Sequence, residues 1–163
     1  MTTSGVFIVL EGGDGCGKST QARLLVARLR EVGREVVATR EPGATEAGAA
    51  IRLLVLGGDH LDPHAEALLI AADRAVHVAE VIRPALERGA VVVSDRYIPS
   101  SLAYQGVARG LGVEEIARLS EWATGGLAPD LVIVFDVPAA DAAARRADPE
   151  DRMEREPDSF RTA

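Results

Sequence analysis

The stretch that most constrains the fold is residues 6–20, which read VFIVLEGGDGCGKST. Its pattern predicts a short apolar strand, then a glycine-rich loop, then a helix that opens at Lys18. The spacing from Gly12 to Ser19 fits the phosphate-binding P-loop pattern GxxxxGK[ST]. In such a loop, backbone N–H groups close around a polyphosphate, the lysine reaches the outer phosphates and the serine ligates Mg²⁺. The alternative is an ordinary glycine-rich turn between a strand and a helix.

Lys18 is the only lysine in the chain, and the other 17 basic side chains are arginines. A lysine ammonium is a compact point charge that suits a phosphate. Its occurrence at the lysine position of the motif therefore favours a functional role over chance. Cys16, in the same loop, is the only cysteine, which excludes an intrachain disulfide and a cysteine-rich zinc site. We interpret it as a small loop residue.

The composition, with 47% hydrophobic and 26% charged residues, predicts one globular domain over residues 1–163. The sequence has no apolar run near the roughly 20 residues of a membrane span and no basic segment at its start, so a cytoplasmic protein without a membrane partner is expected. The net charge of −7 argues against a nucleic-acid surface. Anionic ligands would therefore be bound by local arginines.

Apolar strands alternate with helical patterns along the rest of the chain. Continuous apolar strands without period-two alternation indicate a parallel sheet with helices on both faces, an α/β fold. Pro84 is expected to kink or interrupt the longest helix, and residues 100–106 are expected to lead into a loop. Beyond the first strand, the pattern predicts strands over 35–39, 90–94 and 131–137, and helices over 47–56, 64–87, 113–124 and 139–147.

Several motifs together resemble the bacterial thymidylate kinases: EGGDGCGKST at 11–20, TREPGAT at 39–45, AADRAVH at 71–77, SDRYIPSSLAYQG at 94–106, and DR at 151–152. The resemblance implies a three-layer P-loop kinase fold. It also implies transfer of the γ-phosphoryl group of ATP to dTMP, giving dTDP, with Mg²⁺. Because an ionised phosphate oxygen is the nucleophile, this chemistry requires no general base.

The resemblance also implies residue roles on the ATP side. Lys18 would be the main catalytic charge and Arg96 would bind the dTMP phosphate. Ser19 and Asp95 would hold Mg²⁺, Asp95 through water. Gly15 stands where one subclass carries an arginine, so Arg152, in a lid at 145–160, would supply the missing positive charge. The ATP-binding residues would be Gly12, Gly13, Asp14, Gly15, Cys16, Gly17, Lys18, Ser19, Thr20 and Arg145.

On the acceptor side, Arg74 would hydrogen-bond the thymine carbonyl and Asp14 would approach the 3′-hydroxyl. Tyr104 would lie near the 2′ position and disfavour a 2′-hydroxyl. The substrate-binding residues would be Asp14, Glu41, Arg52, Ile70, Arg74, Arg96, Ser101, Tyr104 and Gln105. Several of these residues could instead have a purely structural role. Asp14 could form a loop hydrogen bond, Asp95 and Arg96 could form a structural ion pair, and Tyr104 could be a core residue. Arg52 could be a solvated helix residue, and the charged tail could be a solvated surface segment.

Two features depart from the family pattern. Ile70 stands where the family usually has an aromatic residue that stacks on thymine, and it offers apolar contact only. Family members also continue past residue 163 with a helix, a fifth strand and a final helix, so the fifth strand is absent and strand 131–137 is expected at a sheet edge. Another nucleotide or nucleoside kinase, or a truncated nucleotide-binding protein with little turnover, therefore stays an alternative. The apolar helix over 65–85 is compatible with a homodimer.

Overall fold

The structure is a computed structural model that describes residues 5–57 and 60–145. The chain forms two compact units, which we describe separately. The sheet unit comprises Met1–Glu41, Ala79–Tyr97 and Ala128–Ala147. The helical unit comprises Pro42–Val78 and Ile98–Leu127.

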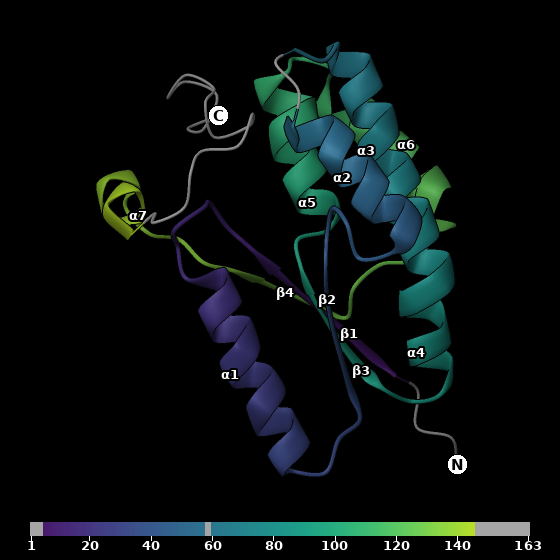
Figure 1. The fold of residues 1–163 in the computed structure, drawn as a ribbon, viewed down its shortest axis with the longest axis vertical. Coiled ribbons are helices and arrows are strands. Elements are labelled where there is room, and N and C mark those ends of the chain that lie inside the picture. The colour runs from purple at the N-terminus through teal and green to yellow at the C-terminus, as the bar shows by residue number, and fades with distance from the viewer. Residues whose placement is uncertain (1–4, 58–59, 146–163) are drawn as a thin grey trace. The chain divides into compact units, whose positions relative to one another are not determined.

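Four parallel strands form the sheet, in the order β2-β3-β1-β4 (Figure 1). Neighbouring strands start in register, with Val6 opposite Val91 and Val36 opposite Val91. This arrangement confirms the predicted α/β class and parallel sheet. The strands are β1 (Val6–Glu11), β2 (Val36–Arg40), β3 (Val91–Asp95) and β4 (Leu131–Val134).

Helix α1 (Lys18–Glu31) covers one face of the sheet, and α4 (Arg83–Glu87) lies on the other side of the strands (Figure 1). Alternate residues of β1 point to opposite faces. Ile8 and Leu10 join the core beneath α1, together with Val26 of that helix. On the same strand Phe7 meets Tyr97 edge to face, with ring centroids 5.0 Å apart. Because both faces are covered, β1 is buried along nearly its whole length.

Strand β4 is the edge strand next to β1, and it ends at Val134, three residues earlier than predicted. Leu131 is 49% exposed and Val134 is 66% exposed, so this edge agrees with the exposed position expected from the sequence. Asp130 anchors the start of the strand, since its Oδ2 accepts a hydrogen bond of 2.7 Å from the Phe7 backbone N–H.

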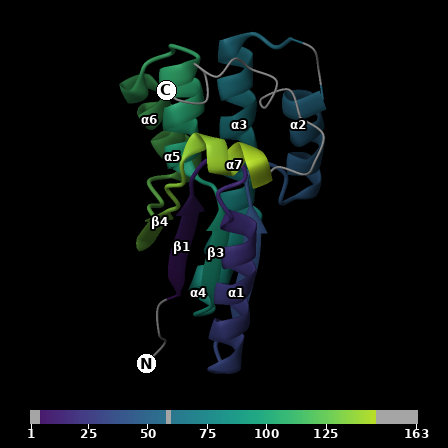
Figure 2. The same ribbon diagram turned by 90° about the vertical axis from the view of Figure 1, so that its left-hand side faces the viewer.

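In the helical unit, α3 lies between α2 and α6 (Figure 2). Helix α3 starts at a proline, and Asp62 caps it by accepting hydrogen bonds from the His64 and Ala65 N–H groups. The unit contains α2 (Glu46–Gly57), α3 (Pro63–His77), α5 (Ile98–Ser101), the π-helical segment η2 (Leu102–Ala108) and α6 (Val113–Thr124).

The structure refines two local predictions. The predicted helix over 64–87 is interrupted by a π-helical turn, η1 (Val78–Ile82), before α4 begins. Pro84 lies in the first turn of α4, where its missing N–H needs no partner. Residues 100–106 lead into a loop over 109–112, as predicted, and the structure adds that residues 98–108 are helical throughout. The last helix described, α7, spans Ala139–Arg145.

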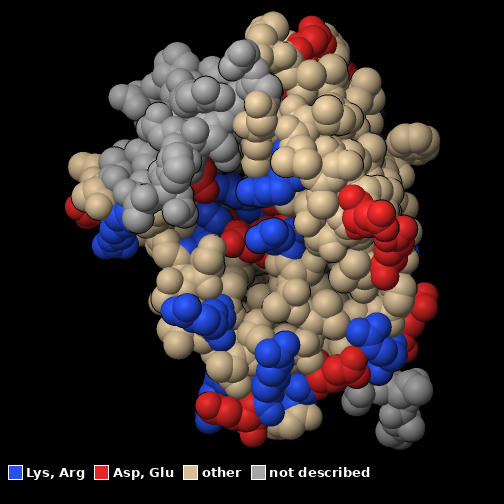
Figure 3. Space-filling view, viewed as in Figure 1, with Lys and Arg blue, Asp and Glu red and all other residues tan. Residues whose placement is uncertain are grey.

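Both basic and acidic side chains are present on the face shown in Figure 3. Exposed pairs include Arg28 with Glu31 at 3.1 Å and Arg88 with Glu35 at 2.7 Å. Such exposed pairs contribute little to stability. None of the helices that the structure describes combines the length and the apolar character needed to cross a membrane.

Candidate active site

The glycine loop between β1 and α1 has a backbone that only glycine adopts easily. Gly12, Gly15 and Gly17 all have positive φ angles, of 138°, 83° and 96°. A Cβ atom at Gly15 would lie 2.2 Å from the backbone oxygen of Ala142 in α7, and one at Gly12 would lie 2.5 Å from that of Phe135. The loop therefore needs glycine at these two positions for steric as well as conformational reasons.

Helix α1 begins directly after this loop, and its start carries no side-chain cap. The residue before it, Gly17, lacks a side chain that could accept from the first N–H groups. Uncapped N–H groups at the positive end of a helix are suited to bind an anion. Thr20 and Ser19 are exposed in the first turn, Gly13 is exposed in the loop, and Cys16 is buried.

Lys18 folds back over the loop that precedes it. Its Nζ donates hydrogen bonds to the carbonyl oxygens of Gly12, at 2.7 Å, and Gly13, at 2.9 Å, and the side chain is only 6% exposed. Burial lowers the pKa of Lys18, and the nearby Arg96 lowers it further, whereas Asp14, 3.9 Å from Nζ, acts in the opposite direction. A desolvated cation of this kind interacts strongly with an arriving phosphate.

Ser19 and Asp95, the two residues that the family resemblance assigns to Mg²⁺, lie side by side. The Ser19 hydroxyl donates to Asp95 Oδ2 at 3.1 Å. The other oxygen, Oδ1, is buried and has no hydrogen-bond partner among the described residues. A hydroxyl beside an unsatisfied carboxylate oxygen fits Mg²⁺, which prefers oxygen ligands and is commonly held by one or two protein groups plus water and phosphate. Within the described part of the chain, no cluster of three metal-binding side chains occurs.

Arg96 is the only non-glycine residue with positive φ, 74°, among those described. Its backbone N–H donates to Leu10 O at 2.9 Å, and its Nη2 lies 2.5 Å from Asp14 Oδ1. The next N–H, of Tyr97, donates to the buried Glu11 carboxylate at 2.9 Å. An arginine fixed in a costly backbone conformation is typical of a functional site. The guanidinium is thereby directed at the glycine loop.

Two other predicted residues of the sheet unit, Glu41 and Arg145, lie at the ends of β2 and α7. Glu41 is 5% exposed, and its N–H donates to Asp95 O at 3.0 Å, which ties the end of β2 to the end of β3. Arg145 is exposed at the end of α7. Arg152 and the rest of the predicted lid from residue 146 lie outside the described residues.

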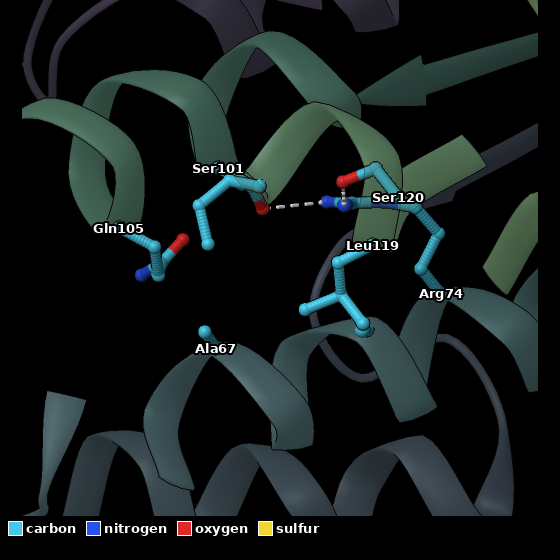
Figure 4. Close-up of a pocket in the computed structure, with 8 residues that line it drawn as sticks. Ala67, Arg74, Ser101, Gln105, Leu119 and Ser120 are labelled. Atoms are coloured by element: carbon cyan, nitrogen blue, oxygen red, sulfur yellow. Dashed lines mark hydrogen bonds between the residues drawn. The ribbon is translucent and has the colours of Figure 1, made fainter. Parts of the chain in front are cut away.

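In the helical unit, Arg74 lies in a small pocket with an almost fully buried side chain, 2% exposed (Figure 4). Its Nη2 donates to Ser101 Oγ at 3.0 Å and its Nη1 donates to Ser120 Oγ at 3.2 Å. The two hydroxyls come from α5 and α6 and fix the plane of the guanidinium. The pocket is lined by Ala67, Ala71, Arg74, Ser101, Gln105, Ile116, Leu119 and Ser120.

Gln105 lines the same pocket and belongs to a buried polar network. Its Nε2 donates to Glu66 Oε1 at 2.8 Å, and Arg109 donates to both oxygens of the same carboxylate, at 3.3 and 3.1 Å. Glu66 is completely buried. Ile70 and Tyr104 are half-buried and do not line this pocket.

The TREPGAT turn continues into the helical unit, where it is held from α2 and α3. The Gly43 N–H donates to Asp73 Oδ1 at 2.9 Å, and Arg52 Nη1 donates to Pro42 O at 3.0 Å. A Cβ atom at Gly43 would lie 2.8 Å from the Arg52 side chain. Half-buried Arg52 is therefore packed against the turn and is no freely solvated helix residue.

Four buried polar residues that support these groups were not predicted from the sequence: Glu11, Glu66, Asp73 and Ser120. A usable signal existed for two of them, since Glu66 and Asp73 interrupt an otherwise alanine- and leucine-rich helix. Charged groups are rarely buried without a partner. Ser120 carries no such signal in sequence.

Comparison with known proteins agrees with this geometry. The family model "Thymidylate kinase" matches residues 10–163. The chain is 58% identical over 143 residues to a thymidylate kinase of Clavibacter michiganensis, covering 87% of this chain and 68% of that protein. It is 53% identical over 164 residues to a thymidylate kinase of Bifidobacterium longum, covering 98% of this chain and 80% of that protein. A crystal structure of thymidylate kinase from Ehrlichia chaffeensis superposes with a TM-score of 0.79 at 35% identity, covering 87% of this chain and 82% of that one.

Proposed function

The chain belongs to the thymidylate kinase family, and from that premise we propose that it transfers the γ-phosphoryl group of ATP to the phosphate of dTMP. The observation that carries this proposal is the buried Lys18 amine in an uncapped glycine loop, beside Ser19 and Asp95. An oxygen of the dTMP phosphate attacks the γ-phosphorus, the bond to the β-γ bridging oxygen breaks, and ADP leaves. The nucleophile is already ionised, so the chain needs to supply only position and positive charge.

In the sheet unit, the backbone N–H groups of the loop over 12–20 would bind the ATP phosphates. Lys18 would stabilise the negative charge on the transferred group, since it is desolvated and already directed at the loop. Arg96 would bind the dTMP phosphate, and its pairing with Asp14 keeps the guanidinium at the loop until substrate arrives. Asp14 would also contact the acceptor sugar.

Mg²⁺ would be held by the Ser19 hydroxyl and by Asp95, whose unsatisfied buried oxygen supports this role. When bound, the ion would neutralise charge on the phosphate oxygens. Glu41, whose backbone is joined to that of Asp95, would lie near the acceptor.

In the helical unit, Arg74, Ser101 and Gln105 would bind the thymine base, because they line one pocket with donors and acceptors in fixed positions. Ile70 would give the base apolar contact, and Tyr104 would lie near the sugar. Arg52 would bind the acceptor phosphate.

The predicted lid lies almost entirely outside the described residues. Residues 145–160 would form the lid, in which Arg152 supplies positive charge to the transferred group and Arg145 lies nearer the adenine. The chain would act as a cytoplasmic homodimer whose partners are ATP and dTMP. The exposed Trp122 of α6, 83% exposed, and Leu53 of α2, 75% exposed, support a contact between copies.

The test is a coupled assay of ADP formation by the 163-residue chain, with ATP and each of dTMP, dUMP, dCMP and dGMP in turn. We expect Mg²⁺-dependent turnover with dTMP as the preferred acceptor. Preference for another acceptor would identify a different nucleotide kinase. ATP binding without turnover would instead support a nucleotide-binding protein.

A further inference from the structure

Glu66 is a completely buried carboxylate to which the proposed chemistry gives no task. It lies on α3 in the helical unit, where it accepts from Gln105 of η2 at 2.8 Å and from Arg109, the residue after η2, at 3.1 Å. Burying a charge is costly unless it is paired and hydrogen-bonded. Its position directly behind a residue that lines the base pocket suggests what it does.

The chemistry of Glu66 fixes which end of the Gln105 amide faces the pocket. An amide has a donor end and an acceptor end, whereas an ionised carboxylate only accepts. The adjacent Arg109 guanidinium favours the ionised form of Glu66. The Gln105 nitrogen must therefore point to Glu66, and its oxygen is turned toward the side of Ser101, as Figure 4 shows.

The pocket is thus lined by an acceptor, the Gln105 oxygen, and by the guanidinium of Arg74, which can only donate. A pyrimidine with a 4-oxo group and an N3–H offers the complementary acceptor and donor. A cytosine offers the reverse, with a 4-amino donor and an unprotonated N3 acceptor. We propose that Glu66 is a positioning residue that sets selectivity for 4-oxo over 4-amino pyrimidines by locking the Gln105 amide. This inference rests on the proposed function of the pocket.

The test compares wild type with Glu66→Gln in the ADP-formation assay, using dTMP, dUMP and dCMP. A glutamine at this position can donate as well as accept, so the Gln105 amide becomes free to rotate. We expect the ratio of kcat/KM for dTMP over dCMP to fall about tenfold, equivalent to 1.4 kcal/mol, chiefly through KM. The ratio for dTMP over dUMP should not change, because both bases carry the same 4-oxo and N3–H groups. A general loss of packing would lower all three activities together.

Glu115→Gln is the matched control, since Glu115 pairs with Arg118 on the exposed surface of α6. The exchange Glu66→Gln with Gln105→Glu should restore selectivity, because it returns an acceptor-only group to the pocket at unchanged charge. If Glu66→Gln does not fold in circular dichroism, the neutral pair Glu66→Gln with Arg109→Gln takes its place.

A folded variant without Glu66 that keeps the wild-type ratio of dTMP over dCMP overturns the inference. A wild-type protein that does not turn over or bind dTMP overturns the proposed function instead. The Glu66 variant therefore tests the inference, and the wild-type protein tests the proposed function.

Discussion

Lys18 and Arg74 are both cations with nearly buried side chains, at 6% and 2% exposure, but they are held in different ways. Lys18 donates to two backbone carbonyls that lie five and six residues before it in the chain. Arg74 donates to two serine hydroxyls that lie 27 and 46 residues after it. The first cation is positioned by the local course of a glycine loop, and the second by the packing of three helices.

The difference determines what each region loses when its cation is removed. The carbonyls that bind Lys18 lie in a loop that is partly open to solvent, so water can replace the amine. The hydroxyls that bind Arg74 are buried with Ser101 at 3% and Ser120 at 1% exposure. They would lose their partner inside a packed core. We therefore expect activity to depend chiefly on Lys18 and folding chiefly on Arg74.

The largest expected effect is on turnover in Lys18→Ala. Loss of the positive charge at the loop should lower kcat about 1000-fold, while the free energy of unfolding changes by no more than about 1 kcal/mol. Steady-state ADP formation and urea unfolding measure the two effects. Arg23→Ala removes an exposed cation from the same helix and should leave both unchanged. Near-normal turnover in Lys18→Ala would show that the loop does not bind the transferred phosphate.

Arg74→Ala should affect stability more than turnover, the reverse of Lys18→Ala. Truncation of a large buried side chain and loss of two hydrogen bonds should lower the free energy of unfolding by about 2–4 kcal/mol. The KM for dTMP should rise about tenfold or more while kcat falls less, because the lost contacts are to the base. Arg118→Ala, on the exposed side of α6, is the control and should be close to neutral. Unchanged kinetics for dTMP in a folded Arg74→Ala protein would remove this residue from base binding.

The same contrast explains how much the sequence could predict. The carbonyl groups that hold Lys18 lie within six residues of it, so the spacing of the glycines was enough to predict the loop, and the structure confirms the strand, loop and helix. Arg74 was identified only through a family resemblance. Its partner Ser120 is an ordinary serine in an amphipathic helix, and only long-range packing brings it within 3.2 Å.

Irregular helices were a second limit on prediction. The sequence did not predict the π-helical segments Val78–Ile82 and Leu102–Ala108, since π-helix is a rare form that the periodicity of an α-helix does not reveal. Glu66 lies in a helix whose pattern predicted only burial. That it faces Gln105 depends on the course of η2, a segment for which the sequence predicted no helix.

A smaller effect is expected from the loop glycines. Alanine at Gly15 or Gly17 adopts an unfavourable positive φ in both cases, at a cost of about 1–2 kcal/mol. Only at Gly15 does the added Cβ also meet a backbone atom, the oxygen of Ala142, whereas nothing lies within 4 Å at Gly17. Gly15→Ala should therefore lower the free energy of unfolding by about 1 kcal/mol more than Gly17→Ala. Equal losses in urea unfolding would mean that α7 does not pack on the loop.

The smallest effect, a pH dependence, separates the two cations most directly. Burial lowers the pKa of Lys18 below its ordinary 10.5, so above the lowered pKa the native state binds fewer protons than the unfolded state. Stability then rises with pH between the lowered pKa and 10.5. At lower pH the full cost of burying the charge is present. An arginine guanidinium stays charged over this range and gives no such rise.

Lys18→Met removes this titrating group while keeping most of the side-chain volume. Wild type should therefore gain stability relative to Lys18→Met as the pH is raised from 7 toward 10, without bound nucleotide. The difference between wild type and Arg74→Ala should stay constant over the same range. Urea unfolding at each pH gives both differences. A wild-type advantage that stays flat or falls would show that Lys18 is not desolvated in the free protein, and that its charge costs the fold nothing before phosphate binds.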